Sequence, residues 1–334
     1  MNGYERTVKF IGGEKVDRPP FMPLAIEWIS RQAGLDYQDF VYDPIKRANA
    51  YLDMCEKYNI DCILPDADFF EQSEDVGAKP EFSDTGYHAD AFLTCPDDVE
   101  KLTPPTFAPG TRMGNRVTTI EEIAKKAKGE KYIFGICIGP FTEYTNARGV
   151  EDGLCEFLEE PEDMLKGMEY FNDIGLEFIE RQLAAGADGI QIVEPSCSLI
   201  SPVMYEEYVL PLHQKLVAKI QENGGIARLH ICGDTTRLMP YSLASGTKVL
   251  DVDYQVDLAN VVGNLADNQY FCGNINPAGE LLQGQPEDFA ALVNKIYTDS
   301  KNRTIISAGC DVPPDTSPEN MIAFYEATEA LAKL

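Results

Sequence analysis

Short apolar runs alternate with longer helical patterns along the chain. The apolar runs cover residues 21–26, 62–65, 133–138, 189–193, 227–231, 249–254, 270–273 and 304–308. Runs this short and this apolar are typical of strands that are buried on both faces of a parallel sheet. Eight of them, separated by helical segments, predict a (β/α)8 TIM barrel, with a doubly wound sheet as the alternative.

The helical patterns carry start signals at their amino ends. Asp43-Pro44 opens a pattern over 43–58, and a proline stands near the start of the pattern over 160–185. Ser201-Pro202 opens a pattern that runs to about residue 222, and Ser317-Pro318 opens the last one. Proline is favoured at the first helical position, where its missing N–H is not needed.

Two further segments complete the expected architecture. We expect a helical extension at the N-terminus, before the first strand. Residues 70–118 are rich in Pro, Gly and Asp and are expected to form an irregular insertion over the barrel mouth. No linker or repeat divides the chain, so a single domain over residues 1–334 is predicted.

Composition narrows the range of functions. The net charge of −27 is spread along the chain and would repel nucleic acid and anionic membrane surfaces. No stretch resembles a signal peptide or a membrane span, which favours a cytoplasmic location. Nine cysteines, an odd number in a chain without an export signal, are expected to be buried, catalytic or metal-bound and not paired in disulfides.

A candidate metal site stands out at the ends of two predicted strands. His230 and Cys232 lie in the segment LHICGD, and side chains two residues apart on a strand point the same way. Cys310 follows the last predicted strand, and all strand carboxyl ends meet on one face of a barrel. One imidazole and two thiols suit zinc, and three protein ligands leave a position open for chemistry.

Other polar residues are weighed against this group. Glu194 ends another predicted strand and is interpreted as a departing fourth ligand, a general base or a structural carboxylate. His88 is expected on the surface and His213 on a helix face. The six remaining cysteines are expected to fill the core.

Six short segments of the chain together resemble the uroporphyrinogen decarboxylase superfamily, and the resemblance extends over nearly the whole chain. The resemblance is closest to its branch of methylcobalamin:coenzyme M methyltransferases and related corrinoid-dependent methyltransferases. It rests on the segments GPFT (139–142), LISP (199–202), LHICG (229–233), GNINP (273–277), GC (309–310) and SPEN (317–320). In that branch the His-x-Cys pair and the late cysteine are zinc ligands, which implies the same role for His230, Cys232 and Cys310.

The decarboxylases themselves are a poorer match. Their paired arginines stand in an RQAGR segment, whereas here Arg31 is retained and Leu35 replaces the second arginine. Their acidic residue that contacts the pyrrole nitrogens corresponds to Asp66. Their active-site tyrosine falls near Asn146 and their late histidine near Cys310. Decarboxylation of a porphyrinogen without a metal is therefore the alternative function, and a barrel that serves only for binding or assembly is a third.

The resemblance implies methyl transfer between cobalamin and a small substrate. A thiol bound to zinc becomes a thiolate and can accept a methyl group, or a methylated donor can pass its methyl group to cobalamin. The chain has no Asp-x-His-x-x-Gly segment, so the cobalamin is expected on a separate corrinoid protein that binds transiently. Neither the direction of transfer nor the small substrate is specified by the sequence.

The resemblance also implies contacts to the substrate and the corrin. Glu194 and Asp66 are the expected catalytic carboxylates. Asn146 and Arg31 are expected to contribute polar contacts, and Phe141 is expected to line a floor beneath the corrin. The alternative for these residues is that they simply pack the top of the barrel.

Overall fold

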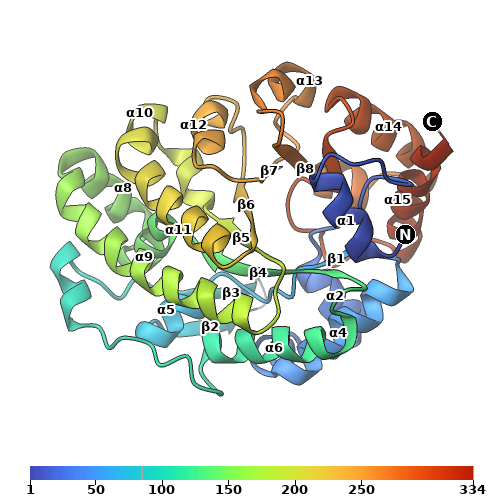
Figure 1. Cartoon of the computed structure of the whole chain (residues 1–334). Helices are drawn as coiled ribbons and strands as arrows, with labels where there is room; N and C mark the ends of the chain where they lie inside the picture. The colour runs from blue at the N-terminus through green and yellow to red at the C-terminus, as the bar shows by residue number, and fades with distance from the viewer. Residues whose placement is uncertain (84–85, 334) are drawn as a thin grey trace.

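A single parallel sheet of seven strands forms the centre of this computed structural model, which describes residues 1–83 and 86–333. The strand order is β1-β4-β5-β6-β7-β8-β9, and each neighbouring pair is parallel. The sheet is curled, with helices around its outside (Figure 1). Its strands are β1 (Cys62–Ile63), β4 (Tyr132–Ile138), β5 (Gly189–Val193), β6 (Ile226–Ile231), β7 (Val249–Val252), β8 (Tyr270–Ile275) and β9 (Thr304–Ala308). The mixed α/β class predicted from the sequence is confirmed at this level.

The first predicted strand is the exception. In place of a strand over 21–26, Phe21 forms one isolated parallel bridge with Ile306 of β9. Met22 N donates to Ile306 O at 2.9 Å, and Asp61 N donates to Phe21 O at 2.9 Å. Prolines at 19, 20 and 23 lack the N–H that a longer ladder requires. Backbone hydrogen bonds thus reach this short segment from both edges of the seven-stranded sheet.

Fifteen α-helices are assigned among the described residues, and most of them cover the outside of the sheet. They are α1 (Gly3–Ile11), α2 (Ile26–Gln32), α3 (Tyr37–Tyr42), α4 (Pro44–Lys57), α5 (Glu71–Val76), α6 (Arg112–Ala127), α7 (Pro140–Arg148), α8 (Val150–Glu159), α9 (Pro161–Ala184), α10 (Pro202–Met204), α11 (Leu210–Glu222), α12 (Met239–Ala244), α13 (Leu258–Val261), α14 (Phe289–Asp299) and α15 (Pro318–Ala330). Shorter 3-10 or π turns are η1 (Pro96–Lys101), η2 (Pro195–Leu199), η3 (Tyr205–Val209), η4 (Val262–Asn264), η5 (Pro277–Leu282), η6 (Pro286–Asp288) and η7 (Leu331–Lys333).

The predicted helix starts agree with the structure. Asp43 caps α4 and Ser317 caps α15 through their side chains, each with proline in the first turn. The pattern that opens at Ser201 is interrupted, because η3 inserts a π-helical turn between α10 and α11. Such single-turn insertions are frequent at functional sites.

The predicted N-terminal helix is α1, which packs against the amino ends of the strands. Tyr4 stacks on Tyr132, the first residue of β4, with ring centroids 6.1 Å apart. Phe10 contacts Tyr270, the first residue of β8. Because α1 occupies this end of the sheet, the carboxyl ends of the strands face the opposite side of the molecule.

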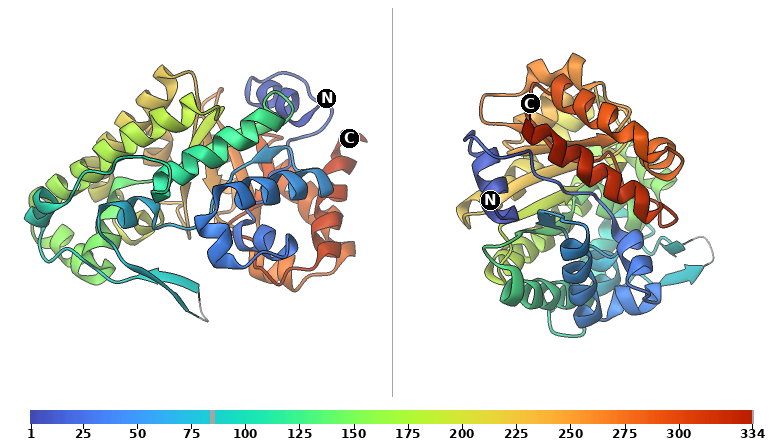
Figure 2. Two further views of the ribbon diagram at one scale, coloured as in Figure 1. Left: turned by 90° about the horizontal axis from the view of Figure 1, so that it is seen from below. Right: turned by 90° about the vertical axis from the view of Figure 1, so that its right-hand side faces the viewer.

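The segment 70–118 is more regular than expected. It contains α5, a hairpin of β2 (Pro80–Ser83) and β3 (Gly86–Ala89), the turn η1 and the start of α6. The hairpin projects from the body on the side opposite α1 (Figure 2). The ring of Phe82 contacts that of Tyr37 on α3.

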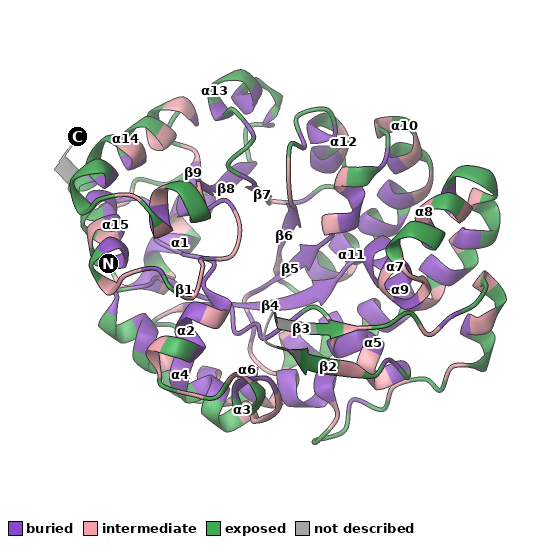
Figure 3. Ribbon diagram, turned by 180° about the vertical axis from the view of Figure 1, so that it is seen from behind, coloured by how far each residue is buried: buried purple, intermediate pink, exposed green. Residues whose placement is uncertain are grey.

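Burial follows the layered arrangement. β4, β5, β8 and β9 of the central sheet are buried along their whole length, whereas the helices keep exposed residues on their outer faces (Figure 3). Among the described residues, no helix combines the length and apolar character needed to cross a membrane.

Helix packing next to β4 gives a test of the fold. A Cβ at Gly167 of α9 would lie 2.2 Å from Cε2 of the fully buried Tyr144 on α7. We predict that Gly167→Ala lowers the free energy of unfolding by about 1–3 kcal/mol, because overpacking outweighs the helix propensity of alanine. Urea unfolding followed by circular dichroism measures this difference.

Gly153→Ala on α8 is the matched control for this helix substitution. Its Cβ would meet Thr145 Cγ2 at an ordinary contact distance of 3.4 Å. Its stability should be equal to or above that of the wild type. Equal destabilisation by both substitutions would contradict the packing argument.

Candidate metal centre and its surroundings

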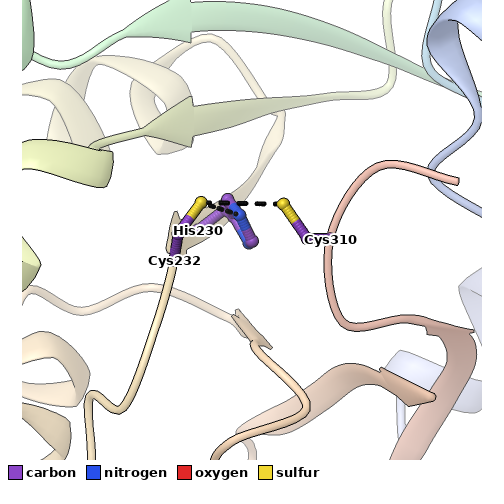
Figure 4. A group of neighbouring side chains, drawn as sticks. All are labelled: His230, Cys232 and Cys310. Carbon is purple, nitrogen blue, oxygen red and sulfur yellow. Dashed lines mark hydrogen bonds between the residues drawn. The ribbon is translucent and has the colours of Figure 1, made fainter. Parts of the chain in front are cut away.

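His230, Cys232 and Cys310 converge at the carboxyl ends of β6 and β9, as the sequence predicts. His230 Nε2 lies 3.1 Å from Cys232 Sγ, and the two sulfur atoms are 3.8 Å apart. One donor atom from each residue lies within 4.8 Å of the others. Figure 4 shows the imidazole and one thiol arriving from β6 and the second thiol from the loop after β9.

The donor set fits zinc in kind and in spacing. Two thiolates on a tetrahedral zinc with Zn–S bonds of about 2.3 Å are separated by about 3.8 Å. The observed separation of the Cys232 and Cys310 sulfur atoms, 3.8 Å, matches this value. His230 is buried and both cysteines are partly exposed, so solvent or a substrate can reach the group on the side of the two thiols.

The ionisation of the three groups is mutually dependent. Burial opposes a charge on His230, but Cys232 and Asp251 outweigh it and raise the pKa of the imidazole. The hydrogen bond from Cys232 lowers the pKa of Cys310, assisted by His230 and opposed by burial. The pKa of Cys232 is raised by the same hydrogen bond. A metal ion binds the neutral imidazole and the thiolates, so binding here has to release the protons that His230 and Cys232 hold.

Two buried residues behind His230 were missed by the sequence reasoning. Asp251 Oδ2 lies 3.2 Å from His230 Nδ1 and accepts a 2.6 Å hydrogen bond from Arg228 Nη2. Burial would raise the pKa of Asp251, yet Arg228 and His230 lower it overall. A signal was present, since charged residues in the strand segments IARLHI and VLDV are unusual in buried strands.

Glu194 faces away from the metal donors. Its Oε1 accepts from Thr142 N at 2.6 Å, and its Oε2 lies 2.6 Å from His213 Nε2. The register pairs Val193 with His230, so Glu194, one residue later, falls on the opposite face of the sheet. The expected ligand role is therefore not met: the carboxylate is engaged in the helix layer and is not part of the donor group described above.

His213 lies on a face of a helix, as the sequence indicated, and that face is the buried face of α11. It is completely buried, and its Nδ1 lies 2.8 Å from the Tyr205 hydroxyl in the π-helical turn η3. Glu194, His213 and Tyr205 thus form a continuous hydrogen-bonded chain, all of it buried. His88, by contrast, is exposed on β3, in agreement with expectation.

The remaining candidate residues divide into two groups. Asp66 is buried, and its Oδ1 accepts from Arg116 Nη2 at 2.6 Å, while Oδ2 has no hydrogen-bond partner among the described residues. Burial raises the pKa of Asp66 to about 6. Arg31 forms an exposed ion pair with Asp315, and Asn146 is partly exposed on α7.

Phe141 requires a correction. Its side chain is fully buried, and its ring lies 5.0 Å from that of Phe157 on α8. An aromatic ring enclosed between α7 and α8 packs the helix layer. It does not form a floor at the mouth of the sheet.

The fold and the site together define the class of protein: an α/β protein with a candidate metal centre formed by His230, Cys232 and Cys310. This centre lies at the carboxyl ends of parallel strands, where the active sites of TIM-barrel enzymes are found. Comparison with known proteins then identifies the family. The family described as uroporphyrinogen decarboxylase (URO-D) matches residues 2–331, and the chain belongs to this family.

Individual relatives include two kinds of enzyme. A methylcobamide:CoM methyltransferase from Methanosarcina mazei is 28% identical over 236 residues, which cover 70% of this chain and 68% of the relative. A uroporphyrinogen decarboxylase from Geobacter sulfurreducens is 24% identical, with 96% of this chain and 97% of the relative covered. The solved structure of a methyltransferase from Methanosarcina mazei superposes with a TM-score of 0.89 at 18% identity and covers 99% of both chains.

Glu143 offers a test of the electrostatics beside the site. It is fully buried on α7, accepts a hydrogen bond from Ser73 Oγ, and its Oε1 has no hydrogen-bond partner among the described residues. Burial, assisted by Glu194, raises its pKa to about 8. The folded protein therefore retains a proton that the unfolded chain releases from about pH 4.5 upwards.

Stability should accordingly fall as the pH rises from about 4.5 to 8, by up to roughly 1.4 kcal/mol per pH unit from this group. Glu143→Gln removes that dependence, so its stability relative to the wild type should increase across the same window. Unfolding midpoints measured from pH 5 to pH 8 test this. Glu159→Gln, at an exposed position of α8, controls for the loss of one charge. A difference between Glu143→Gln and wild type that is constant with pH would refute the assignment.

Proposed function

We propose that this protein is a zinc-dependent methyltransferase that moves a methyl group between a corrinoid protein and a small substrate. The observation that carries the proposal is the His230, Cys232 and Cys310 group, whose donor spacing fits zinc. Membership of a family that includes a methylcobamide:CoM methyltransferase supports it. The substrate in this proposal is a thiol or a methylated donor.

The proposed architecture is a single (β/α)8 barrel domain in which the segment around Phe21 takes the place of the eighth strand. The hydrogen bonds that this segment makes to β9 and to Asp61, just before β1, support that view. Active sites of such barrels lie at the carboxyl ends of the strands. His230 lies near the carboxyl end of β6, and Cys232, Cys310 and Asp66 follow β6, β9 and β1, while Arg31 lies on α2 after the bridge at Phe21; this arrangement supports the proposal.

Each residue has a separate part in the proposed chemistry. Bound zinc would lower the pKa of a coordinated thiol or polarise a methylated donor. His230, Cys232 and Cys310 would hold the metal, with one side left for substrate. Asp66 would accept a hydrogen bond from the substrate through Oδ2, and Asn146 and Arg31 would contact the substrate or the corrin. Glu194 would act indirectly, by fixing the end of β5 beside His230.

The corrinoid partner would approach the carboxyl end of the sheet. A methyl group bonded to cobalt cannot leave its macrocycle, so the corrin itself has to reach the partly exposed thiols. The partner must also visit another enzyme to be remethylated or demethylated. The interface is therefore expected to be of modest size and partly polar.

Zinc content provides the first test. We predict that Cys232→Ala and Cys310→Ala lose most of the bound zinc and retain the wild-type circular dichroism spectrum, since three-ligand zinc sites are not the source of folding energy in a chain of this size. Cys155→Ala, at an exposed thiol on α8, is the matched control and should keep its zinc. Wild-type zinc content in both triad variants would remove the metal assignment.

Methyl exchange provides the second test. Metal-loaded protein should transfer methyl groups between cobalamin and at least one member of a panel of thiols and methylated donors, followed by the visible spectrum of the cobalamin. Removal of zinc should reduce the rate by roughly 100-fold or more. A metal-loaded protein that alters no cobalamin form but decarboxylates a porphyrinogen would establish the alternative function.

A further inference from the structure

Arg228, His230 and Asp251 form a buried group inside the curled sheet, directly behind the metal donors. Arg228 and His230 are two residues apart on β6, so their side chains point to the same face of the sheet. The parallel register then places Asp251 of β7 beside His230. All three side chains are almost fully buried, with at most 2% of each residue exposed. A charge-bearing group at this depth needs a reason, because burying charge is costly.

The two nitrogens of His230 have different neighbours. Nε2 lies 3.1 Å from Cys232 Sγ, on the side of the metal donors. Nδ1 lies 3.2 Å from Asp251 Oδ2, within ion-pair distance, and makes no hydrogen bond to any described residue. Only Nε2 is therefore in position to bind a metal held by the two thiols, and Nδ1 is left to carry the ring proton.

Arg228 holds the carboxylate in place from the other side. The Nη2 atom of Arg228 donates a hydrogen bond to Asp251 Oδ2 at 2.6 Å. Asp251 is the carboxylate that pairs with Arg228 among the described residues. The guanidinium also contacts Met22 Sδ and lies over the ring of Phe134, so the surroundings are apolar. A buried cation in such surroundings strongly favours a fixed anion next to it.

We propose that Asp251 is the positioning residue of this site: held by Arg228, it orients His230 so that Nδ1 keeps the proton and Nε2 binds the metal. This inference rests on the metal site of the proposed function. Carboxylates that accept from a ligating imidazole fix its tautomer and ring orientation, and their loss weakens metal binding by 10–100-fold in other proteins. Asparagine at 251 would present an N–H or a weaker acceptor to Nδ1 and would lose the charge opposite Arg228.

The chain supplies a matched control for the loss of a buried carboxylate. Asp61 is also buried and accepts hydrogen bonds from Arg6 Nη1 and Arg18 Nη1, each at 2.6 Å. It immediately precedes β1, at the end of the sheet opposite the metal donors. Asp61→Asn therefore disturbs a buried ion pair without touching His230. A purely structural role of Asp251 would make the two asparagine variants alike.

The experiment measures the zinc dissociation constants of wild type, Asp251→Asn and Asp61→Asn by competition with a chromophoric chelator. It also records visible spectra of the cobalt-substituted proteins. We expect Asp251→Asn to bind zinc 10–100-fold more weakly and to show an altered cobalt spectrum, and Asp61→Asn to match the wild type in both. Unchanged affinity in Asp251→Asn, or equal weakening in Asp61→Asn, would overturn the positioning role.

A second measurement needs no substitution that could impair folding. The chain has three histidines, so the spectrum of the zinc-loaded wild type labelled with nitrogen-15 at histidine is readily assigned. We expect Nε2 of His230 to be metal-bound and Nδ1 to be protonated; metal binding through Nδ1 would overturn the inference. A wild type that binds no zinc would overturn the proposed metal site as well, whereas normal zinc binding with the wrong nitrogen would overturn this inference alone.

Discussion

The parallel register between β6 and β7 is the constraint on which the candidate site depends. It sets His230 beside Asp251, while alternation along β6 brings Arg228 to the same buried face. A slip of β7 by one residue would turn Asp251 to the opposite face of the sheet, away from Arg228 and His230. Since an ion pair buried this deeply is tolerated only when its partners stay in contact, the pair of Arg228 and Asp251 in turn makes alternative registers unfavourable.

A second polar network lies on the other face of the same sheet. Glu194 N donates to His230 O at 2.9 Å, so the backbone joins the end of β5 to the residue that offers the imidazole. The Glu194 side chain, however, is committed to Thr142 N and His213 in the helix layer. Its carboxylate leaves no room for a side chain at Gly139, whose Cβ would lie 2.3 Å from Oε2. His230 is therefore held by a backbone hydrogen bond from Glu194, at the end of β5, and lies beside the Asp251 carboxylate of β7.

Several features could be predicted from the sequence because they follow from periodicity. Seven of the eight apolar runs contain strands, and the convergence of His230, Cys232 and Cys310 could be predicted because strand alternation and strand ends are readable without a structure. The run over 21–26 became a bridge because its prolines remove ladder donors. Glu194 was placed at the correct strand end, but its three interpretations stayed open because the pairing of β5 with β6 decides which face of the sheet its side chain takes.

Other features depend on contacts between distant segments and were beyond sequence reasoning. The role of Asp251 depends on which strand lies next to β6, and that of His213 depends on how α11 packs against Glu194, the residue after β5. Phe141 stands next to a strand end, yet the packing of α8 encloses its ring. In each case the residue type was informative, but only the tertiary neighbour determined what the side chain does.

The approach of Cys310 to Cys232 depends on the glycine that precedes it. Gly309 N donates to Ile275 O, which extends the pairing of β9 with β8 by one residue beyond Ala308, the last residue of β9. A Cβ at 309 would lie only 2.3 Å from Tyr254 N, so any larger residue would push the loop after β9 away from the end of β7. β7 also carries Asp251, which lies beside the imidazole of His230. The close contact at Gly309 therefore keeps Cys310 near the strand that carries this carboxylate.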